Sequence, residues 1–182
     1  MILSDYDLEN MIREERLIIK PFEKEIIREN GIDLRLDNEI ALHNTKLGPD
    51  FILDPSNEEH IGKSYELMKN KTELVIPARS QALLSTLEYV KLPSNLVGFV
   101  ELRSTWARHG LLAPPTIIDA GFEGNITLEI YNTAPYGIML KPGARFAHVI
   151  FAMTANSVRN PYKGTYLGQK GVKLPKAIKE PK

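Results

Sequence analysis

The sequence predicts an all-β (mainly β) fold: a distorted β-barrel or double-sheet roll with a short N-terminal helix and one or two short helical turns. Short apolar runs follow one another from residue 17 to residue 153, and turn residues such as Pro and Gly separate them. Several runs alternate apolar and polar residues, which is the pattern of a strand with one buried face. The short spacing leaves little room for helices between the strands.

The N-terminal part of the chain supplies the expected helix and the first two strands. Ser4-Asp5-Tyr6-Asp7 has the character of a capping box, and the apolar residues after it recur at helical spacing. Residues 17–20 and 32–36 are predicted strands, the first ending at Pro21. Residues 43–63 are polar and rich in turn residues, which predicts an excursion on the surface.

The rest of the chain is predicted to form strands, two hairpins and a C-terminal segment. The single strands are residues 72–77, 82–90 and 96–100. A turn signal that begins at Asp119 separates two apolar runs, so residues 116–131 are predicted to form a β-hairpin. A second hairpin is expected over residues 136–153, with its turn at Lys141-Pro142-Gly143. Residues 160–182 lack an apolar period, which by itself predicts a flexible terminus.

Length and composition limit the domain organisation and the class of function. Residues 1–182 are expected to form a single domain that can bury a core. The formal net charge is zero, so no overall field attracts nucleic acid or an anionic membrane. The sequence has no cysteine and its four histidines lack the spacing of metal ligands, so a zinc site is not expected. No apolar run is long enough to span a bilayer and no secretory signal is evident, so we expect a cytoplasmic protein.

Chemically active side chains gather between residues 103 and 129. Arg103-Ser104-Thr105 follows an apolar run, and a strand end that carries guanidinium, hydroxyl and free N–H groups is suited to bind phosphate oxygens. Glu129 lies in the middle of a predicted strand, where a carboxylate is costly without a partner, and Arg108 is the nearest candidate in the sequence. The arrangement predicts a site that binds a phosphorylated ligand and transfers protons on it. The simpler alternative is a capped strand end with solvated arginines.

These residues lie in segments that resemble the dCTP deaminase family, in its archaeal form, within the superfamily that includes the trimeric dUTPases. The resemblance covers most of the chain in the same order. It implies a dUTPase-like barrel, in which Asp33 and Arg35 would have a structural or interface role. The segments that carry it are Arg103-Ser104-Thr105-Trp106-Ala107-Arg108-His109-Gly110, Ile118-Asp119-Ala120-Gly121-Phe122-Glu123-Gly124-Asn125-Ile126-Thr127-Leu128-Glu129, Asn30-Gly31-Ile32-Asp33-Leu34-Arg35-Leu36, Lys141-Pro142-Gly143-Ala144-Arg145-Phe146 and Tyr166-Leu167-Gly168-Gln169-Lys170-Gly171.

The resemblance implies hydrolytic deamination of dCTP to dUTP and ammonia, a step of pyrimidine deoxynucleotide metabolism, without zinc. Glu129 would carry protons between the attacking water, the pyrimidine ring and the leaving ammonia. Arg108 would pair with Glu129 and favour its charged form. Ser104 would hold the water, helped by a backbone carbonyl near Thr116 or Ile117.

The resemblance also implies how the nucleotide is bound. Arg103, Ser104 and Thr105 would contact the phosphates, Asp119 would accept a hydrogen bond from the 3′-hydroxyl, and Phe122 would lie against the deoxyribose. The other substrate-binding residues that it implies are Arg108, Thr116, Ile117, Thr127, Leu128, Tyr162 and Gln169.

Three further features follow from the resemblance. Residues 160–182 would close over the triphosphate, and because Thr165 replaces the lysine usual in the family, Lys163 or Lys170 is expected to supply the charge. Mg²⁺ would be bound through the substrate triphosphate, without protein ligands of its own. The chain would form a homotrimer whose sites lie between subunits.

Other functions stay open at this point. In a dUTPase-like dUTP pyrophosphatase, Asp119 would orient a water toward the α-phosphorus. Glu129, and the lack of a Gly-rich arginine motif at the C-terminal end, favour deamination instead. The segment from Arg108 to Asp119 is shorter than in bacterial deaminases and lacks an arginine that they carry, so a bifunctional enzyme that forms dUMP from dCTP is a third candidate. A β-roll that only binds nucleotides is a fourth.

Overall fold

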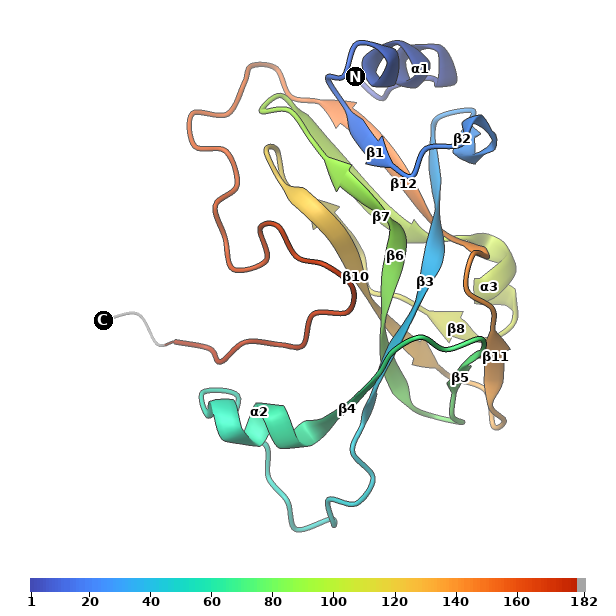
Figure 1. Ribbon diagram of the computed structural model, residues 1–182, viewed down its shortest axis with the longest axis vertical. Coiled ribbons are helices and arrows are strands. Elements are labelled where there is room, and N and C mark those ends of the chain that lie inside the picture. The colour runs from blue at the N-terminus through green and yellow to red at the C-terminus, as the bar shows by residue number, and fades with distance from the viewer. Residues whose placement is uncertain (180–182) are drawn as a thin grey trace.

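The chain folds mainly into β-strands that curl around one core (Figure 1). The structure is a computed structural model and describes residues 1–179. Its helices are α1 (Asp5–Arg13), α2 (Glu58–Ser64) and α3 (Ser104–Arg108), with a 3₁₀ turn η1 (Lys24–Ile26). Its strands are β1 (Ile18–Lys20), β2 (Ile27–Arg28), β3 (Gly31–His43), β4 (Tyr65–Met68), β5 (Leu74–Ile76), β6 (Gln81–Lys91), β7 (Leu96–Leu102), β8 (Leu111–Leu112), β9 (Thr116–Ile118), β10 (Glu123–Asn132), β11 (Ile138–Leu140) and β12 (Arg145–Met153). The all-β fold class predicted from the sequence is confirmed.

The main sheet is antiparallel and curls because its longest strand serves two halves. The strand order is β8-β10-β6-β3-β12-β7-β9, while β5 and β11 form a separate two-stranded sheet. The first part of β3 pairs with β12, through Ile32 to Arg35, and its last part pairs with β6 and β4. The register of the β3–β6 pair shifts between Leu36 and Ile40, and such irregularities bend a strand and increase its twist. The distorted barrel is the result.

The core lies inside this curl and is aliphatic and aromatic. Burial of these side chains removes apolar surface from water, at about 25 cal/mol per Å², and is the main stabilising term. The largest fully buried side chains are Leu8, Leu17, Ile26, Ile32, Leu34, Leu36, Ile40, Leu74, Ile76, Leu84, Phe146 and Phe151. In the described part of the chain, no helix combines the length and apolarity that crossing a membrane requires.

Both hairpins predicted from the sequence are wrong, although both turns are present. The turn after β9 is closed by Phe122 N–H, which donates to Asp119 O at 3.0 Å, but β9 then pairs with β7 and β10 pairs with β6 and β8. Similarly, β11 pairs with β5, while β12 lies between β3 and β7. A turn between two apolar runs fixes where the chain reverses, whereas the strand partner depends on which long strand offers an unpaired edge.

Helix ends follow the sequence closely. The capping box at α1 forms: Ser4 N–H donates to Asp7 Oδ2 at 3.0 Å, and Asp7 N–H donates to Ser4 Oγ at 3.3 Å. Within the predicted excursion, Asn57 is the N-cap of α2, since its Oδ1 accepts hydrogen bonds from the N–H groups of Glu59 and His60. The end of the excursion is therefore a helix, which leads directly into β4.

Two buried acidic side chains hold the strands of the barrel together, in line with the structural role predicted for Asp33 and Arg35. Glu88 is fully buried, and it accepts hydrogen bonds from Arg35 N–H at 2.7 Å and from Arg35 Nε at 2.6 Å. Asp33 is 2% exposed and lies 2.9 Å from His148 Nδ1 and 3.1 Å from Arg103 Nε. A buried carboxylate needs such partners, because an unpaired charge in the interior is strongly unfavourable.

Candidate active site

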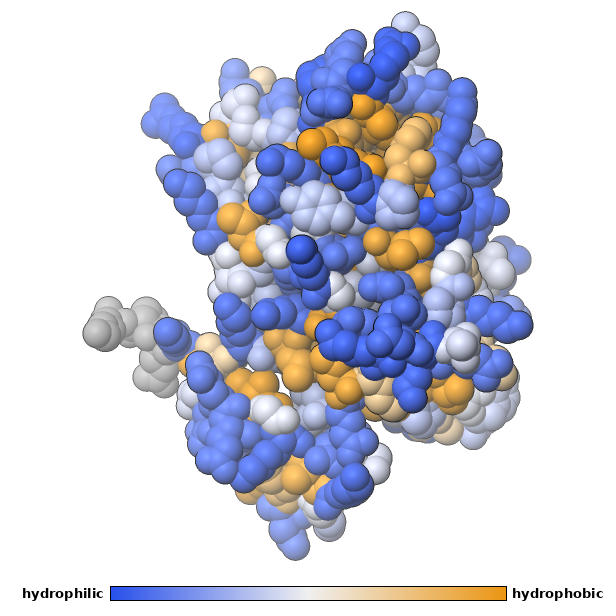
Figure 2. Space-filling view, in the orientation of Figure 1, coloured by the Kyte–Doolittle hydropathy of each residue, from blue (hydrophilic) through white to orange (hydrophobic). Residues whose placement is uncertain are grey.

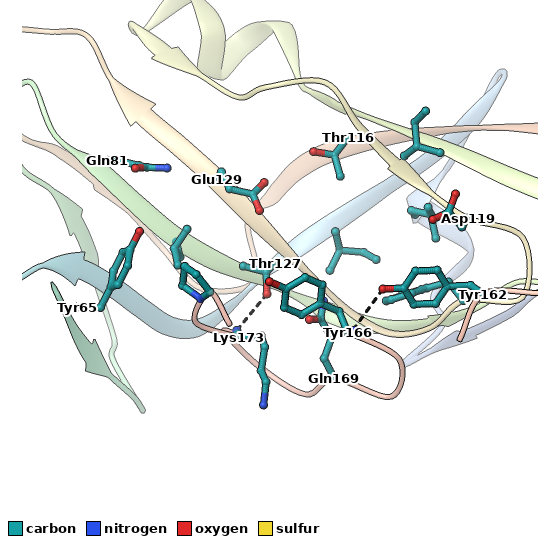
Figure 3. Close-up of a pocket in the computed structure, with 16 residues that line it drawn as sticks. Tyr65, Gln81, Thr116, Asp119, Thr127, Glu129, Tyr162, Tyr166, Gln169 and Lys173 are labelled. Atoms are coloured by element: carbon teal, nitrogen blue, oxygen red, sulfur yellow. Dashed lines mark hydrogen bonds between the residues drawn. The ribbon is translucent and has the colours of Figure 1, made fainter. Parts of the chain in front are cut away.

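A pocket of about 350 Å³ opens between β10, β9 and the C-terminal segment, with β4 and β6 at its far end (Figure 3). Most of the residues predicted to act on the substrate line it. These are Thr116, Ile117, Asp119, Phe122, Thr127, Glu129, Tyr162 and Gln169. They come from segments that are far apart in the sequence, so the fold brings the predicted set together.

The strand β10 presents Thr127 and Glu129 to the pocket because its side chains alternate between two faces. Ile126, Leu128 and Ile130 are buried, while Thr127 and Glu129 are partly exposed. Figure 3 shows the Glu129 carboxylate pointing into the cavity rather than away from it. Burial raises the pKa of the Glu129 carboxyl above its ordinary value, and a hydrogen bond with its own backbone opposes this rise. A raised pKa makes this carboxylate a better proton acceptor than an ordinary glutamate, and the protonated group can then return the proton.

The turn between β9 and β10 shapes the other end of the pocket. It places Asp119 at the pocket and buries most of Phe122, which is 7% exposed. Gly121 in this turn has a φ of +85°, and a Cβ atom there would lie 2.6 Å from Cβ of Pro161. Only glycine tolerates both conditions, so the turn and the C-terminal segment can pack closely.

The C-terminal segment lies along β10 and forms one wall of the pocket. Asn125 N–H donates to Gln169 O at 3.0 Å, and the Gln169 side-chain amide donates to Asn125 O at 2.7 Å. Lys173 N–H donates to Thr127 Oγ1 at 3.1 Å, and Tyr162 packs edge to face on Phe122 with ring centroids 5.6 Å apart. The ordered packing does not match the flexible terminus that composition alone predicts. The last three residues of the predicted segment 160–182 lie outside the described residues.

The predicted phosphate-binding residues Arg103, Ser104 and Thr105 lie elsewhere in the same chain. They line a second pocket of about 350 Å³, together with Asp33 and His148. The two pockets have no lining residue in common, although β9, which borders the Glu129 pocket, pairs with β7, the strand that leads to Arg103. A single copy of the chain therefore does not bring the Arg-Ser-Thr group to Glu129.

The structure of a single chain bears on two sequence-based assignments. In residues 1–179 no ion pair joins Arg108 to Glu129, because Arg108 ends α3 while Glu129 faces the pocket from β10, and the pKa of Glu129 is raised instead of lowered. The side chain of Leu128 is 5% exposed and belongs to the core, on the opposite face of β10 from Thr127 and Glu129. Its side chain is therefore not available to a ligand in the pocket.

The sequence reasoning missed four polar residues that line the pocket: Tyr65, Gln81, Tyr166 and Lys173. Tyr65 and Gln81 stand at the first positions of β4 and β6, where the strand pattern gives no signal of function. Of the lysines that could replace the one missing at Thr165, the structure places Lys173 at the pocket, whereas Lys163 and Lys170 do not line it.

The pocket offers acid, hydroxyl and amide groups. In residues 1–179, no group of three or more His, Cys, Asp or Glu side chains is arranged to hold a metal ion. The hydroxyl of Thr127 accepts from the C-terminal segment, which leaves its own hydrogen free to donate. A carboxylate with adjustable protonation, surrounded by neutral donors, is suited to proton transfer on a polar ligand.

Comparison with known proteins gives a consistent result. Residues 2–154 match the family model described as dCTP deaminase-like. A protein of Caldivirga maquilingensis named dCTP deaminase is 44% identical over 180 residues, which cover 98% of each chain. A protein of the same name from Pyrobaculum aerophilum is 45% identical over 179 residues, again with 98% of each chain covered. Among solved structures, the 2′-deoxycytidine 5′-triphosphate deaminase of Agrobacterium tumefaciens superposes with a TM-score of 0.63 at 17% identity, over 82% of this chain and 46% of that one, a likeness of fold.

Proposed function

The chain belongs to the dCTP deaminase-like family, and on that basis we propose that it is a dCTP deaminase that releases ammonia and forms dUTP. The observation that carries the proposal is the position of Glu129, whose carboxylate points into a pocket that also holds Asp119, Phe122 and the C-terminal segment. The Glu129 carboxylate forms no ion pair within residues 1–179, so a structural salt bridge does not account for an acid at this position.

The proposed reaction needs one proton carrier. Water adds to C4 of the cytosine ring while Glu129, in its ionised form, takes a proton from that water and passes it to N3. The C4–N bond then breaks, the 4-amino group leaves as ammonia with a second proton from the water, and a carbonyl remains at C4. One water is consumed and one ammonia is released, so dCTP becomes dUTP. The raised pKa of the Glu129 carboxyl favours the protonated form that must return the proton.

The same pocket can hold the sugar of the nucleotide. In the proposal, Asp119 accepts a hydrogen bond from the 3′-hydroxyl, and Phe122, supported by Tyr162, lies against the deoxyribose. Gln169 of the C-terminal segment and Thr127 of β10 line the pocket where hydrogen bonds join that segment to the strand. Lys173 supplies a cationic group at this wall and takes the place of the lysine missing at Thr165.

The triphosphate requires a second copy of the chain. Arg103, Ser104 and Thr105 line a separate pocket, so they reach the nucleotide only if they come from a neighbouring subunit. We place Arg108 with them, since it ends the same short helix, α3. A homotrimer with sites at the subunit boundaries satisfies this condition, because each boundary then pairs the Glu129 pocket of one copy with the Arg-Ser-Thr group of the next. The substrate in this proposal is the magnesium complex of dCTP, with Mg²⁺ held by the phosphate oxygens.

A product assay tests the proposed activity. Purified protein is incubated with dCTP and Mg²⁺, and ammonia, dUTP, dUMP and pyrophosphate are measured separately. Equal amounts of ammonia and dUTP are expected, without pyrophosphate. If dCTP is not consumed, the proposed function is wrong. The control substrates are dCMP and cytidine, which should react poorly because they lack the triphosphate.

A bifunctional enzyme is the second candidate, and one observation favours it. Asp119 and Glu129 line the same pocket, so an acid suited to orient a water toward the α-phosphorus lies near the acid suited to deaminate the base. The assay above distinguishes the two, because a bifunctional enzyme would release ammonia and pyrophosphate in equal amounts and accumulate dUMP.

Removal of the C-terminal segment should weaken nucleotide binding more than folding. A chain that ends at Pro161 loses Tyr162, Gln169 and Lys173 from the pocket, while its main sheet stays complete. We expect KM for dCTP to rise by about tenfold or more, as several contacts of about 1 kcal/mol each are lost. Because Val172 is 5% exposed, the melting temperature should also fall by several degrees. Unchanged KM, with circular dichroism confirming the fold, would show that the segment takes no part in binding.

A further inference from the structure

Three side chains at or beside the far end of the pocket have no role in the reaction proposed above. His43 ends β3, Tyr65 begins β4 and Gln81 begins β6. These strands are paired, with His43 opposite Tyr65 and Leu42 opposite Ala82 in the register, so the three residues are brought together by the sheet. Tyr65 and Gln81 both line the cavity that contains Glu129. We call these three residues the donor cluster.

His43 fixes the two other members. Its ring packs on Tyr65 with centroids 4.7 Å apart, and its Nε2 lies 3.2 Å from Gln81 Oε1. With the Gln81 amide oriented in this way, its oxygen accepts from the Nε2–H tautomer of His43. The Gln81 nitrogen then faces the other way, and Figure 3 shows it directed toward Glu129.

Tyr65 is held as a hydrogen-bond donor. Its ring packs on a small apolar cluster that contains Val172 of the C-terminal segment, and Figure 3 shows its hydroxyl directed into the pocket. Burial raises the pKa of Tyr65, and the negative charge of Glu129 raises it further. Both effects keep the hydroxyl protonated, so that it can donate toward the carboxylate.

Glu129 has a use for such donors. A general base must be ionised when water attacks, whereas burial of the Glu129 carboxyl favours the neutral form. Within residues 1–179 no cation pairs with it, and the ammonium group of Lys173 points away from it in Figure 3. Neutral hydrogen-bond donors can stabilise the ionised form without the full desolvation cost of a buried cation.

We propose that Tyr65 and Gln81 are positioning residues that donate hydrogen bonds, directly or through one water, to the Glu129 carboxylate, and that His43 fixes both donors. The inference rests on the proposed function of Glu129. The inference also gives residues 43–63 a role, because this segment and its helix α2 lead the chain back to the pocket and position Tyr65 there. Other titratable groups also face the cavity around Glu129 and belong to the same electrostatic environment. They are Asp119 after β9, Tyr162, Tyr166 and Lys173 of the C-terminal segment, and, across the adjoining small cavity, Glu101 of β7.

The test compares Tyr65→Phe, Gln81→Leu and the double variant with Tyr136→Phe, an exposed tyrosine outside the pocket. Tyr65→Phe keeps the ring that packs on His43 and removes only the donor. The first measurement is the pH profile of kcat/KM for dCTP, which reports groups of the free enzyme. We expect the acidic limb to move to higher pH in both single variants, with about tenfold loss of kcat/KM at the acid end and recovery at higher pH. Tyr136→Phe should match the wild type.

The second measurement needs no activity. The carboxyl ¹³C signal of Glu129 is titrated by NMR in the substrate-free protein, and its midpoint should move upward in Tyr65→Phe and further in the double variant. An unmoved midpoint, or a loss of kcat/KM that is the same at every pH, overturns the proposal. If the wild type fails to deaminate dCTP, the proposed function fails, yet the titration still decides whether the donor cluster stabilises the ionised carboxylate.

Discussion

Replacement of Glu129 by glutamine should abolish ammonia release from dCTP while the nucleotide still binds. The amide has nearly the same shape as the carboxyl group, so the pocket keeps its form, but it cannot accept the proton of the attacking water. We expect kcat to fall by about 10²–10⁴-fold, the range in which general acid–base groups contribute. The dissociation constant for dCTP, measured by calorimetry, should stay within a few-fold of the wild type, because the change removes an interaction of the transition state rather than of the ground state.

Two variants give this experiment its controls. Glu123 lies on the same strand as Glu129, forms a salt bridge with Lys91 at 2.8 Å and does not line the pocket. The variant Glu123→Gln should therefore keep full activity. Asp119→Asn changes the other acid of the pocket: it should remove pyrophosphate release from a bifunctional enzyme, and it should raise KM for dCTP because Asp119 also binds the 3′-hydroxyl in the proposal. Turnover of Glu129→Gln at the wild-type rate would exclude Glu129 from the mechanism.

Glu129→Gln and Glu123→Gln should have opposite effects on the melting temperature. Burial raises the pKa of Glu129, so its contribution to stability is fully present below the ordinary pKa of a glutamate and is lost as the pH rises through the raised value. Charged Glu129 therefore costs stability at neutral pH, and Glu129→Gln should melt at or above the wild-type temperature. The pKa of Glu123 is lowered by its hydrogen bond with Lys91, so its contribution is present above the ordinary pKa and is lost as the pH falls through the lowered value. Glu123→Gln should accordingly melt slightly below the wild type at neutral pH.

Local pattern was enough to predict much of the fold and of the pocket. The alternation of Ile126, Leu128 and Ile130 with Thr127 and Glu129 shows from sequence which side chains share a face, and the structure has them so. It did not show that β10 pairs with β6 rather than with β9, because apolar alternation is the same whichever strand lies beside it. The hairpin prediction failed for this reason.

Two parts of the site depend on long-range geometry. Tyr65 follows a polar segment that resembles a surface loop, and only the capping of α2 by Asn57 and the pairing of β4 with β3 bring it to Glu129's pocket. Arg103 and Glu129 are close in sequence, yet their side chains line different pockets of the folded chain. Nearness in sequence therefore suggested an Arg108–Glu129 pair that one chain does not make.

This separation makes subunit mixing the sharpest test of a shared site. The proposed site takes Arg108, with the phosphate-binding residues, from one copy and Glu129 from the next, so Arg108→Ala and Glu129→Gln should each be inactive alone, with losses of about 10²-fold or more. Neither change disturbs an ion pair of residues 1–179, so both chains should fold. When the two chains are co-expressed and purified as mixed oligomers, a boundary is intact if its Glu129 comes from the Arg108→Ala chain and its Arg108 from the other. With equal amounts and random assembly, about one quarter of the boundaries meet this condition, so activity should recover to about a quarter of the wild type.

A second mixture distinguishes the two arrangements independently. Wild-type chain is mixed with equal amounts of the double variant Arg108→Ala/Glu129→Gln. Sites built within one chain would retain about half of the wild-type activity, whereas sites built across a boundary would retain about a quarter, because both neighbours must be wild type. Recovery in the first mixture together with a quarter in the second would require the arginine and the glutamate of each site to come from different copies. No recovery in the first mixture, together with half of the wild-type activity in the second, would mean that one chain completes its own site. The helix α3 would then have to move from its present position. There it lies beside β8, and Trp106 Nε1 donates a hydrogen bond to the Arg145 carbonyl at 2.9 Å.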